Sequence, residues 1–309
     1  MSALELLNRP MLDDDVAATA RSPWALQLRD MVRDYSRASL PVMNGGFKYS
    51  NLKQGDDQIL TCGPYRLWEY SSLFLLHDST KPWRRFLDVG GAASPLPYFL
   101  AERGIAGRAV DLQPLLVAVC NHVAEVRGIP LTAEVADVTA DDVRTRPTFE
   151  SFDLVTCVSV LEHVPPAGRA ALLAALFRLL EPGGLLYLTF DYGDYVEHDD
   201  YRGAGGAPSH SSSSISDLAA LCEMLASAGF IFAGNDPRAL PADVLALRRA
   251  PHADSVMRRY WLNSGPFDAA TPLRAVAKYA MKRIVPVARA GASRYQHHNF
   301  FRMFLRRPA

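Results

Sequence analysis

Short apolar runs alternate with helical stretches from residue 84 to about residue 190, and this alternation constrains the fold more than any other feature of the chain. The runs have the length of buried strands: RRFLDV, RAVDL, LTAEVAD, FDLVTCVSV and GLLYLTF. Strands that alternate with helices predict a doubly wound, mostly parallel α/β sheet. After the helix expected in ISDLAALCEMLASAG, the runs FIFAG and VLALRRA predict two further strands that are antiparallel to each other, for seven in all.

The segments on either side of this core suggest three regions. Residues 23–38 and 64–77 space their apolar side chains at helical intervals, which predicts an N-terminal helical cap over residues 1–83. The α/β domain then covers residues 84–250, with a loop insert at about 192–214 that contains the small, polar stretch GAGGAPSHSSSS. Residues 251–309 are expected to form a basic C-terminal helical extension.

The composition is that of an ordinary globular protein. The 309 residues carry no net charge, and no apolar segment approaches the length of a membrane span. The N-terminus reaches acidic residues before an apolar run that could serve as a signal peptide, so we expect a cytoplasmic protein. The four cysteines are far apart and form no CxxC pair, which suggests neither a disulfide framework nor a zinc site.

A glycine-containing turn follows the first strand of the core, in LDVGGAASP. Gly90 and Gly91 lack a Cβ, and Ala92 is small, so a cofactor can lie against the backbone close to Asp88. Asp111 and Asp137 close the next two runs. Each feature alone also fits a tight connection or a helix N-cap. Taken together, three acidic strand ends at the carboxyl edge of an open sheet indicate a ligand site.

Five segments together carry a family resemblance: LDVGGAAS, VDLQP, ADV, FDLVTCVSVLEHVPP and LLEPGGLLYLTF. Over roughly residues 84–250 the chain resembles the class I S-adenosylmethionine (SAM)-dependent methyltransferases, especially the small-molecule branch typified by the enzymes of ubiquinone and menaquinone biosynthesis. The resemblance implies a Rossmann-like domain with SAM as its cofactor. A nicotinamide dehydrogenase would need Gly-x-Gly-x-x-Gly at the first turn, and this chain lacks that fingerprint.

The resemblance also implies which residues contact SAM. The turn after the first strand would hold the methionine part, Asp111 would bind the ribose, and Asp137 with Val138 would face the adenine. The family's Gly-x-Gly-x-Gly pattern is replaced here by Gly90, Ala92 and Ser94, which narrows the space for the cofactor. The full set of expected cofactor contacts is Asp88, Gly90, Gly91, Ala92, Asp111, Leu112, Asp137, Val138 and Ser159.

Methyl transfer to oxygen or nitrogen requires that the acceptor lose a proton, and a histidine positioned as a base can accept it. His163 follows the fourth strand and Asp191 follows the fifth, so the two side chains can meet at the cleft if those strands are neighbours. We therefore expect His163 as a base oriented by Asp191. The same LEHV string also occurs in relatives whose histidine has no known role in proton transfer.

Two other segments allow more than one interpretation. The acidic stretch DYGDYVEHDDY could bind a metal, but its spacing is not that of a ligand set, and a solvated loop that lends tyrosines to an acceptor pocket is our expectation. Residues 271–287 form a basic amphipathic pattern, followed by HHNFFRMFLRRPA. This tail suits a membrane surface or a phosphate-bearing partner, or it packs on the domain with its charges in water.

The sequence thus predicts a SAM-dependent methyltransferase that acts on the oxygen or nitrogen of a small molecule, such as a sugar, a quinone, a lipid-linked compound or a secondary metabolite. The alternatives are an RNA or protein methyltransferase and an inactive SAM-binding protein. No metal and no DNA partner are expected. The acceptor and the oligomeric state cannot be read from the sequence.

Overall fold

The structure is a computed structural model of the 309-residue chain. It describes residues 7–37, 53–54, 60–61, 64–78, 80–92, 94–140, 151–194, 196–197, 212–248 and 299–309.

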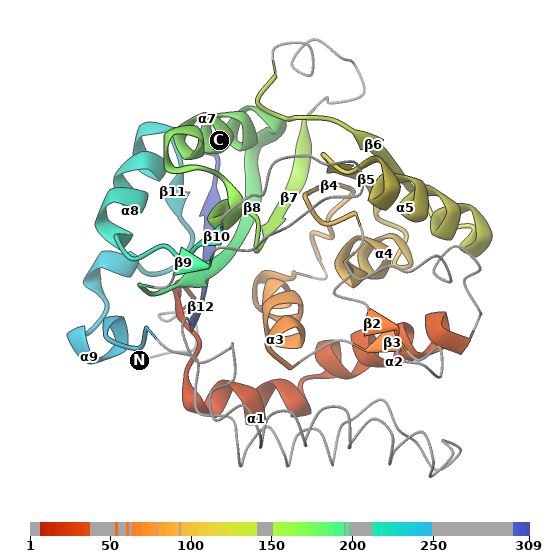
Figure 1. The fold of residues 1–309 in the computed structure, drawn as a ribbon, viewed down its shortest axis with the longest axis horizontal. Helices are drawn as coiled ribbons and strands as arrows, with labels where there is room; N and C mark the ends of the chain where they lie inside the picture. The colour runs from red at the N-terminus through yellow and green to blue at the C-terminus, as the bar shows by residue number, and fades with distance from the viewer. Residues whose placement is uncertain are drawn as a thin grey trace.

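An eight-stranded sheet forms the centre of the molecule, in the order β1-β12-β8-β7-β4-β5-β6, with β11 also paired to β12 (Figure 1). The five strands expected between residues 84 and 192 are present, and they are mutually parallel. Their bounds are β4 (Arg85–Val89), β5 (Ala106–Asp111), β6 (Leu131–Val135), β7 (Phe152–Val158) and β8 (Leu180–Tyr192). The predicted α/β class with a mostly parallel sheet is confirmed.

The order of the parallel strands creates a switch point between β4 and β7. From β4 the chain proceeds outward through β5 to β6, and it then returns to the other side of β4 to form β7 and β8. Helices that leave neighbouring strands in opposite directions open a crevice at the carboxyl ends of those strands, where ligands of open α/β sheets bind. Asp88 and Ser159 lie at the carboxyl ends of the two strands that flank this point.

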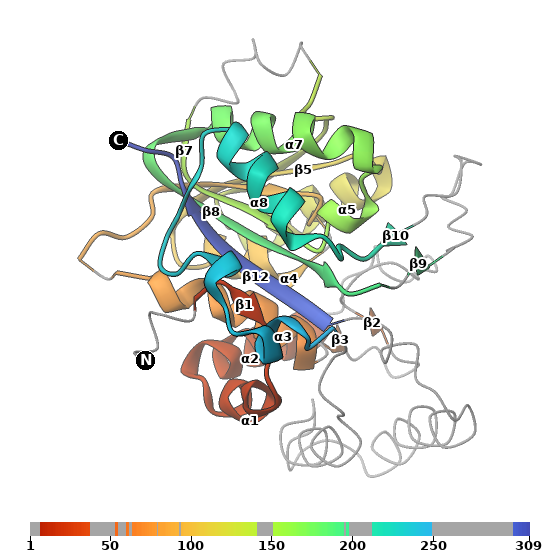
Figure 2. The same ribbon diagram turned by 90° about the vertical axis from the view of Figure 1, so that its left-hand side faces the viewer.

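Helices cover both faces of the sheet (Figure 2). Helices α4 (Pro95–Ala101) and α5 (Pro114–Arg127) share one buried cluster with Phe86, Leu185 and Tyr187. Helices α7 (Pro166–Leu179) and α8 (Leu218–Ser227) share the other with Leu87 and Leu186. Consecutive strand residues therefore point to opposite faces, and both faces are apolar, which explains why these strands read as continuous apolar runs.

The N-terminal helices join the first of these clusters. They are α1 (Asp13–Arg21), α2 (Pro23–Arg37) and α3 (Pro64–Ser72), which continues into a 3-10 turn, η3 (Leu73–Leu76). Leu28 of α2 and Leu67 and Trp68 of α3 are buried against the α4 side of the sheet. Helices therefore stand at the two places where the helical cap was predicted, and α1 lies beside them against α3.

The last strand corrects the prediction for the end of the chain. Residues 251–309 were expected to be helical, but β12 (Asn299–Arg306) is a strand between β8 and β11. It runs antiparallel to β8, so that Phe301 faces Phe190 and Phe304 faces Tyr187 across the pair. Residues 299–305 are buried, and this part of the tail cannot rest on a membrane surface. The amphipathic pattern at 271–287 lies outside the described residues.

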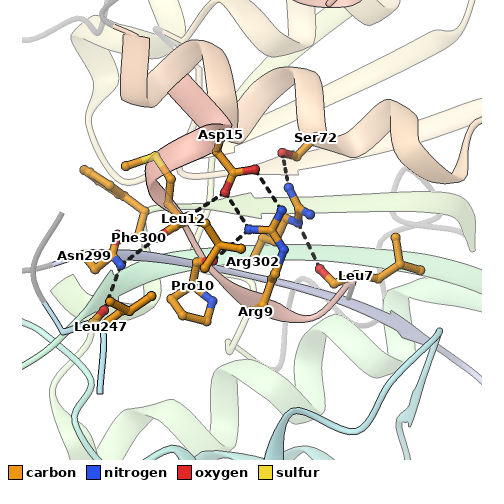
Figure 3. A network of polar contacts seen from close by, with 11 residues as sticks. Leu7, Arg9, Pro10, Leu12, Asp15, Ser72, Leu247, Asn299, Phe300 and Arg302 are labelled. Carbon is orange, nitrogen blue, oxygen red and sulfur yellow. Dashed lines mark hydrogen bonds and ion pairs between the residues drawn. The ribbon is translucent and has the colours of Figure 1, made fainter. Parts of the chain in front are cut away.

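A polar network attaches the N-terminal segment to β12 (Figure 3). β1 (Arg9–Pro10) pairs with Arg302 and Phe301 of β12. The Arg302 side chain donates to Leu7 O and Ser72 Oγ, both at 2.9 Å, and its guanidinium lies over the Trp68 ring. Arg302 is only 4% exposed, and burial, with Arg9 next, lowers its pKa to about 10, while Asp15 opposes the shift.

Smaller elements differ from the predictions. The run VLALRRA was expected to be a strand, but α9 (Ala242–Leu245) covers its start, and the antiparallel partner of β11 (Ile231–Phe232) is β12. Within the predicted loop insert, β9 (Val196–Glu197) pairs with β10 (Ser212–Ser213). The remaining short elements are β2 (Lys53–Gln54), β3 (Leu60–Thr61), η5 (Leu161–His163) and η6 (Pro237–Ala239).

Candidate active site

The turn after β4 can be built only with glycine at two successive positions. Gly90 has a φ of +74°, its N–H donates to Val110 O at 2.7 Å, and a Cβ there would lie 2.6 Å from Val160 Cγ2. A Cβ on Gly91 would lie 2.0 Å from Asp88 Oδ2. The glycines therefore let the backbone fold tightly over the Asp88 carboxyl group, as predicted.

Asp88 is buried at the end of β4, with 1% of its surface exposed. Thr156 on β7 donates to Asp88 Oδ1 at 2.5 Å, while Oδ2 has no hydrogen-bond partner among the described residues. Burial raises the pKa of Asp88 to about 7, the Thr156 hydrogen bond opposes this, and Asp111 adds to the rise. A buried oxygen without a partner at the sheet rim is a group that a ligand can satisfy.

Asp111 ends β5 beside this turn. Its carboxylate accepts the backbone N–H of Gln113 at 2.9 Å and those of Leu112 and Ala92, so its orientation is fixed from both sides of the crevice. Burial raises the pKa of Asp111, and these three N–H groups oppose the rise. The neighbouring Leu112 side chain is 64% exposed, an unusual position for a large apolar residue.

The third acidic residue is in a different environment. Asp137 lies beyond β6, is exposed, and accepts hydrogen bonds from Thr139 N at 2.8 Å and Thr139 Oγ1 at 2.7 Å, so it also closes its own turn. Val138 next to it is buried in the apolar cluster on the α7 side. Of the three predicted acidic residues, only Asp88 and Asp111 are thus buried at the rim of the sheet. Adenine contacts by Asp137 and Val138 stay a prediction.

Ser159, directly after β7, lies in a buried polar cluster that includes α3. It is a non-glycine residue with a φ of +52°. Its hydroxyl donates to Glu69 Oε1 at 2.7 Å, and Thr189 Oγ1 of β8 donates to the same oxygen at 2.6 Å. Arg66 Nη1 contacts Glu69 Oε2 at 2.6 Å and also Ser159 Oγ. Helix α3 thus reaches the carboxyl ends of both strands.

The two predicted catalytic residues are placed differently. His163 is the last residue of η5, and its side chain is exposed. Asp191 is half-buried near the end of β8. Glu162, the residue before His163, is 1% exposed and interacts electrostatically with Asp191, Glu69 and Arg66. The pairing of His163 with Asp191 stays a prediction, while Glu162 and Asp191 interact electrostatically.

Four residues of this site were not predicted from the sequence: Arg66, Glu69, Thr156 and Glu162. Arg66 and Glu69 stand three positions apart in an otherwise apolar helix, PYRLWEYSS, which could have signalled a buried ion pair. Glu162 lies in the SVLEHV string, directly before the histidine that was expected to act as a base. Nothing in the local sequence distinguishes Thr156 from other strand residues.

The described part of the chain offers neither a membrane-spanning segment nor a metal site. None of its helices has the length and hydropathy needed to cross a membrane. Within those same residues, no three His, Cys, Asp or Glu side chains are grouped so that they could hold a metal ion. Part of the acidic stretch considered for a metal, residues 195 and 198–201, lies outside them.

Comparison with known proteins was consistent with this geometry. Residues 86–184 match the model of the family described as methyltransferase domain. The chain is 38% identical over 107 residues to the ubiquinone biosynthesis O-methyltransferase of Xanthomonas oryzae pv. oryzae, a match that covers 34% of this chain and 42% of that enzyme. The enzyme of Xanthomonas euvesicatoria pv. vesicatoria is also 38% identical, over 105 residues. The chain therefore spans less than half the length of these relatives.

The chain is also similar to two solved structures. The [4+2]-cyclase SpnF is 19% identical, with a TM-score of 0.45, over 93% of this chain and 97% of that one. The phosphoethanolamine N-methyltransferase 2 of Haemonchus contortus, in complex with S-adenosyl-L-methionine, is 17% identical, with a TM-score of 0.46. The match covers 91% of this chain and 60% of that one.

Proposed function

We propose that the protein is a class I SAM-dependent methyltransferase that transfers the methyl group of SAM to an oxygen or nitrogen atom of a small molecule, because residues 86–184 match a methyltransferase domain. One observation carries the proposal. Asp88 and Asp111 are buried at the carboxyl ends of the neighbouring strands β4 and β5, joined by a turn in which Ala92 N–H donates to Asp111. Carboxylates at this rim accept the hydroxyl and amino donors of a nucleoside-bearing cofactor.

The residues at the rim fit SAM chemically. Asp111 is held by three backbone donors and keeps further lone pairs for the ribose hydroxyls. Asp88 Oδ2 is an acceptor in the same turn with no partner among the described residues. The exposed Leu112 side chain offers an apolar surface beside them for a base. SAM supplies an activated methyl group whose transfer leaves a neutral thioether, and the protein supplies alignment in a crevice from which water is excluded.

The acceptor side of the reaction is assigned to the ends of β7 and β8. His163 is the proton acceptor in this proposal and Asp191 is its partner, since His163 follows β7 and Asp191 lies near the carboxyl end of the neighbouring strand β8. An exposed imidazole can also exchange its proton with solvent after each turnover. Acceptors in the range of sugars, quinones, lipid-linked compounds and secondary metabolites fit such a site, and the curated relatives act in ubiquinone biosynthesis.

Calorimetric titration with SAM tests the proposal directly. We expect wild-type protein to bind SAM, and Asp111→Ala to weaken binding by about 10- to 100-fold, because hydrogen bonds to a charged group are worth about 1.5–3 kcal/mol. Asp243→Ala, at an exposed position in α9, is the matched control. If the wild-type protein ignores SAM, or if Asp111→Ala binds it equally well, the proposed function is wrong.

A second experiment tests the catalytic pair. Once an acceptor has been found, His163→Ala and Asp191→Asn should each lower turnover by about 10²- to 10⁴-fold if the pair transfers the proton. The SAM affinity of His163→Ala should stay near the wild-type value. A loss of only a few-fold in both variants would remove the pair from the mechanism and leave positioning as the source of catalysis.

A further inference from the structure

Like Asp88, Glu162 is a buried acidic residue of the site whose hydrogen bonding is incomplete within the described part of the chain. It is 1% exposed, and neither of its carboxylate oxygens has a hydrogen-bond partner among the described residues. Glu69, at a comparable depth in the same cluster, accepts hydrogen bonds from Arg66, Ser159 and Thr189. A buried carboxyl group with two unsatisfied oxygens is costly, so its presence in the crevice calls for a ligand.

The charges that face Glu162 define what such a ligand must be. Burial is the main cause that raises the pKa of Glu162, Asp191 is the next, and Glu69 adds to the rise. Arg66 is the cation that opposes the shift, but its guanidinium is already 2.6 Å from Glu69 Oε2. Three carboxyl groups therefore surround one guanidinium. A positively charged group relieves the repulsion, whereas an anionic one increases it.

The cluster is also accessible from one side. The Arg66 side chain is 27% exposed, whereas that of Glu69 is fully buried. Asp191 is half-buried, and both Glu162 and Asp191 lie by the carboxyl ends of β7 and β8, on the rim that carries Asp88 and Asp111.

We infer that the cluster around Glu162, with Asp191 and Glu69, is a receptor for an organic cation. The inference rests on the proposed function and deepens it. The cation has two possible sources: the sulfonium of SAM, or the ammonium group of an amine acceptor. In the first case Glu162 distinguishes the charged cofactor from its neutral product. In the second it selects amines over alcohols and carboxylates as acceptors.

The substitution Glu162→Gln separates these cases because it removes the charge and keeps the shape. SAM and S-adenosylhomocysteine both carry the same amino and carboxylate groups, so their affinity ratio isolates the sulfonium. If the sulfonium is the ligand, Glu162→Gln should weaken SAM about 10- to 100-fold and leave S-adenosylhomocysteine unchanged. Glu181→Gln, at an exposed surface pair with Arg84, is the control and should alter neither affinity.

The second case, an amine acceptor, is tested with methylammonium, which is one of the smallest organic cations. In the presence of saturating S-adenosylhomocysteine, methylammonium chloride should raise the melting temperature of the wild-type protein above that in sodium chloride of equal ionic strength. Sodium acetate should not do so. The stabilisation should disappear in Glu162→Gln and persist in Glu181→Gln.

Unchanged behaviour of a folded Glu162→Gln protein in both experiments would overturn the inference. A wild-type measurement covers the case in which that variant does not fold. The pKa of Glu162 is raised by burial, and a bound cation would lower it, so titrations in two buffers of different ionisation enthalpy should show more proton release with SAM than with S-adenosylhomocysteine, or proton release with methylammonium. Release with neither cation overturns the inference, whereas failure to bind SAM at all overturns the proposed function instead.

Discussion

The hydroxyl of Ser159 donates a hydrogen bond of 2.7 Å to Oε1 of Glu69, which stands 90 positions earlier in the chain. This bond joins helix α3 to the carboxyl end of β7. It also helps to hold Ser159 at a φ of +52°, a conformation that residues with a side chain rarely adopt. The N-terminal helix is therefore part of the active-site wall rather than an appendage.

Glu69→Gln should destabilise the protein by about 2–4 kcal/mol, because it removes one partner of a buried ion pair and leaves Arg66 without its carboxylate. Denaturant unfolding measures the change. Glu181→Gln breaks an exposed pair with Arg84 and should cost less than about 1 kcal/mol. Equal effects of the two substitutions would contradict the structural role of Glu69.

Asp88→Asn should change how stability depends on pH. The folded pKa of Asp88 is about 7, above the ordinary value of 3.8, so the folded state holds a proton that the unfolded state has released between those values. Wild-type stability therefore falls as the pH rises from about 4 to about 7, and the Asn variant lacks this contribution. We expect the variant to gain about 2–4 kcal/mol relative to the wild type across that window.

The free energies of unfolding of both proteins, measured at several pH values, give this difference. Other groups titrate equally in the two proteins, so their contributions cancel when one free energy is subtracted from the other. Asp30→Asn changes an exposed carboxylate in α2 and serves as the comparison. A gap between the Asp88→Asn and wild-type curves that stays constant with pH would show that Asp88 titrates normally.

Gly91→Ala should lower SAM affinity as well as stability. The new Cβ would lie 2.0 Å from Asp88 Oδ2, so either the turn or the carboxyl group must move. Gly104→Ala provides a contrast, because Gly104 has a φ of +78° and nothing within 4 Å of the new atom. We expect Gly104→Ala to cost about 1–2 kcal/mol of stability with normal SAM binding. Normal binding by Gly91→Ala would mean that the turn does not shape the cofactor site.

Arg302→Met should destabilise the fold by about 2–4 kcal/mol, because Leu7 O and Ser72 Oγ lose a buried charged donor. Arg306→Met, at the exposed end of the same strand, should cost less than about 1 kcal/mol. Thermal unfolding compares the two. If both arginines are equally dispensable, β12 is not anchored through Arg302.

The sequence predicted those parts of the fold whose local residue pattern directly reflects their place in the tertiary structure. The five parallel strands read as continuous apolar runs because both faces of the sheet are covered, and the turn at Gly90 and Gly91 is visible because only glycine fits it. Asp111 was identifiable because an acidic residue that ends a buried apolar run places its carboxylate at the rim of the sheet.

The parts that were missed depend on contacts between distant residues. Arginines in NFFRMFLRR suggested a solvated or membrane-facing tail, but the charge of Arg302 is accommodated by Leu7 and Ser72, more than 200 residues away in the chain. Asp88 and Asp111 proved buried, whereas Asp137 did not, and the sequence does not distinguish them. Glu162 is buried and His163 next to it is exposed, because a 3-10 turn rotates consecutive side chains apart.

Strand β12 has a consequence for biosynthesis. It pairs with β8 on the edge opposite to β7, and it is also the partner of both β1 and β11. All of these strands are synthesised before β12. Until residue 306 has left the ribosome, one edge of β8 has no partner, and the N-terminal segment has nothing to pair with. Between the synthesis of residue 192 and that of residue 306 the nascent chain therefore carries an open apolar sheet edge, which makes it a natural client for chaperones that shield such edges.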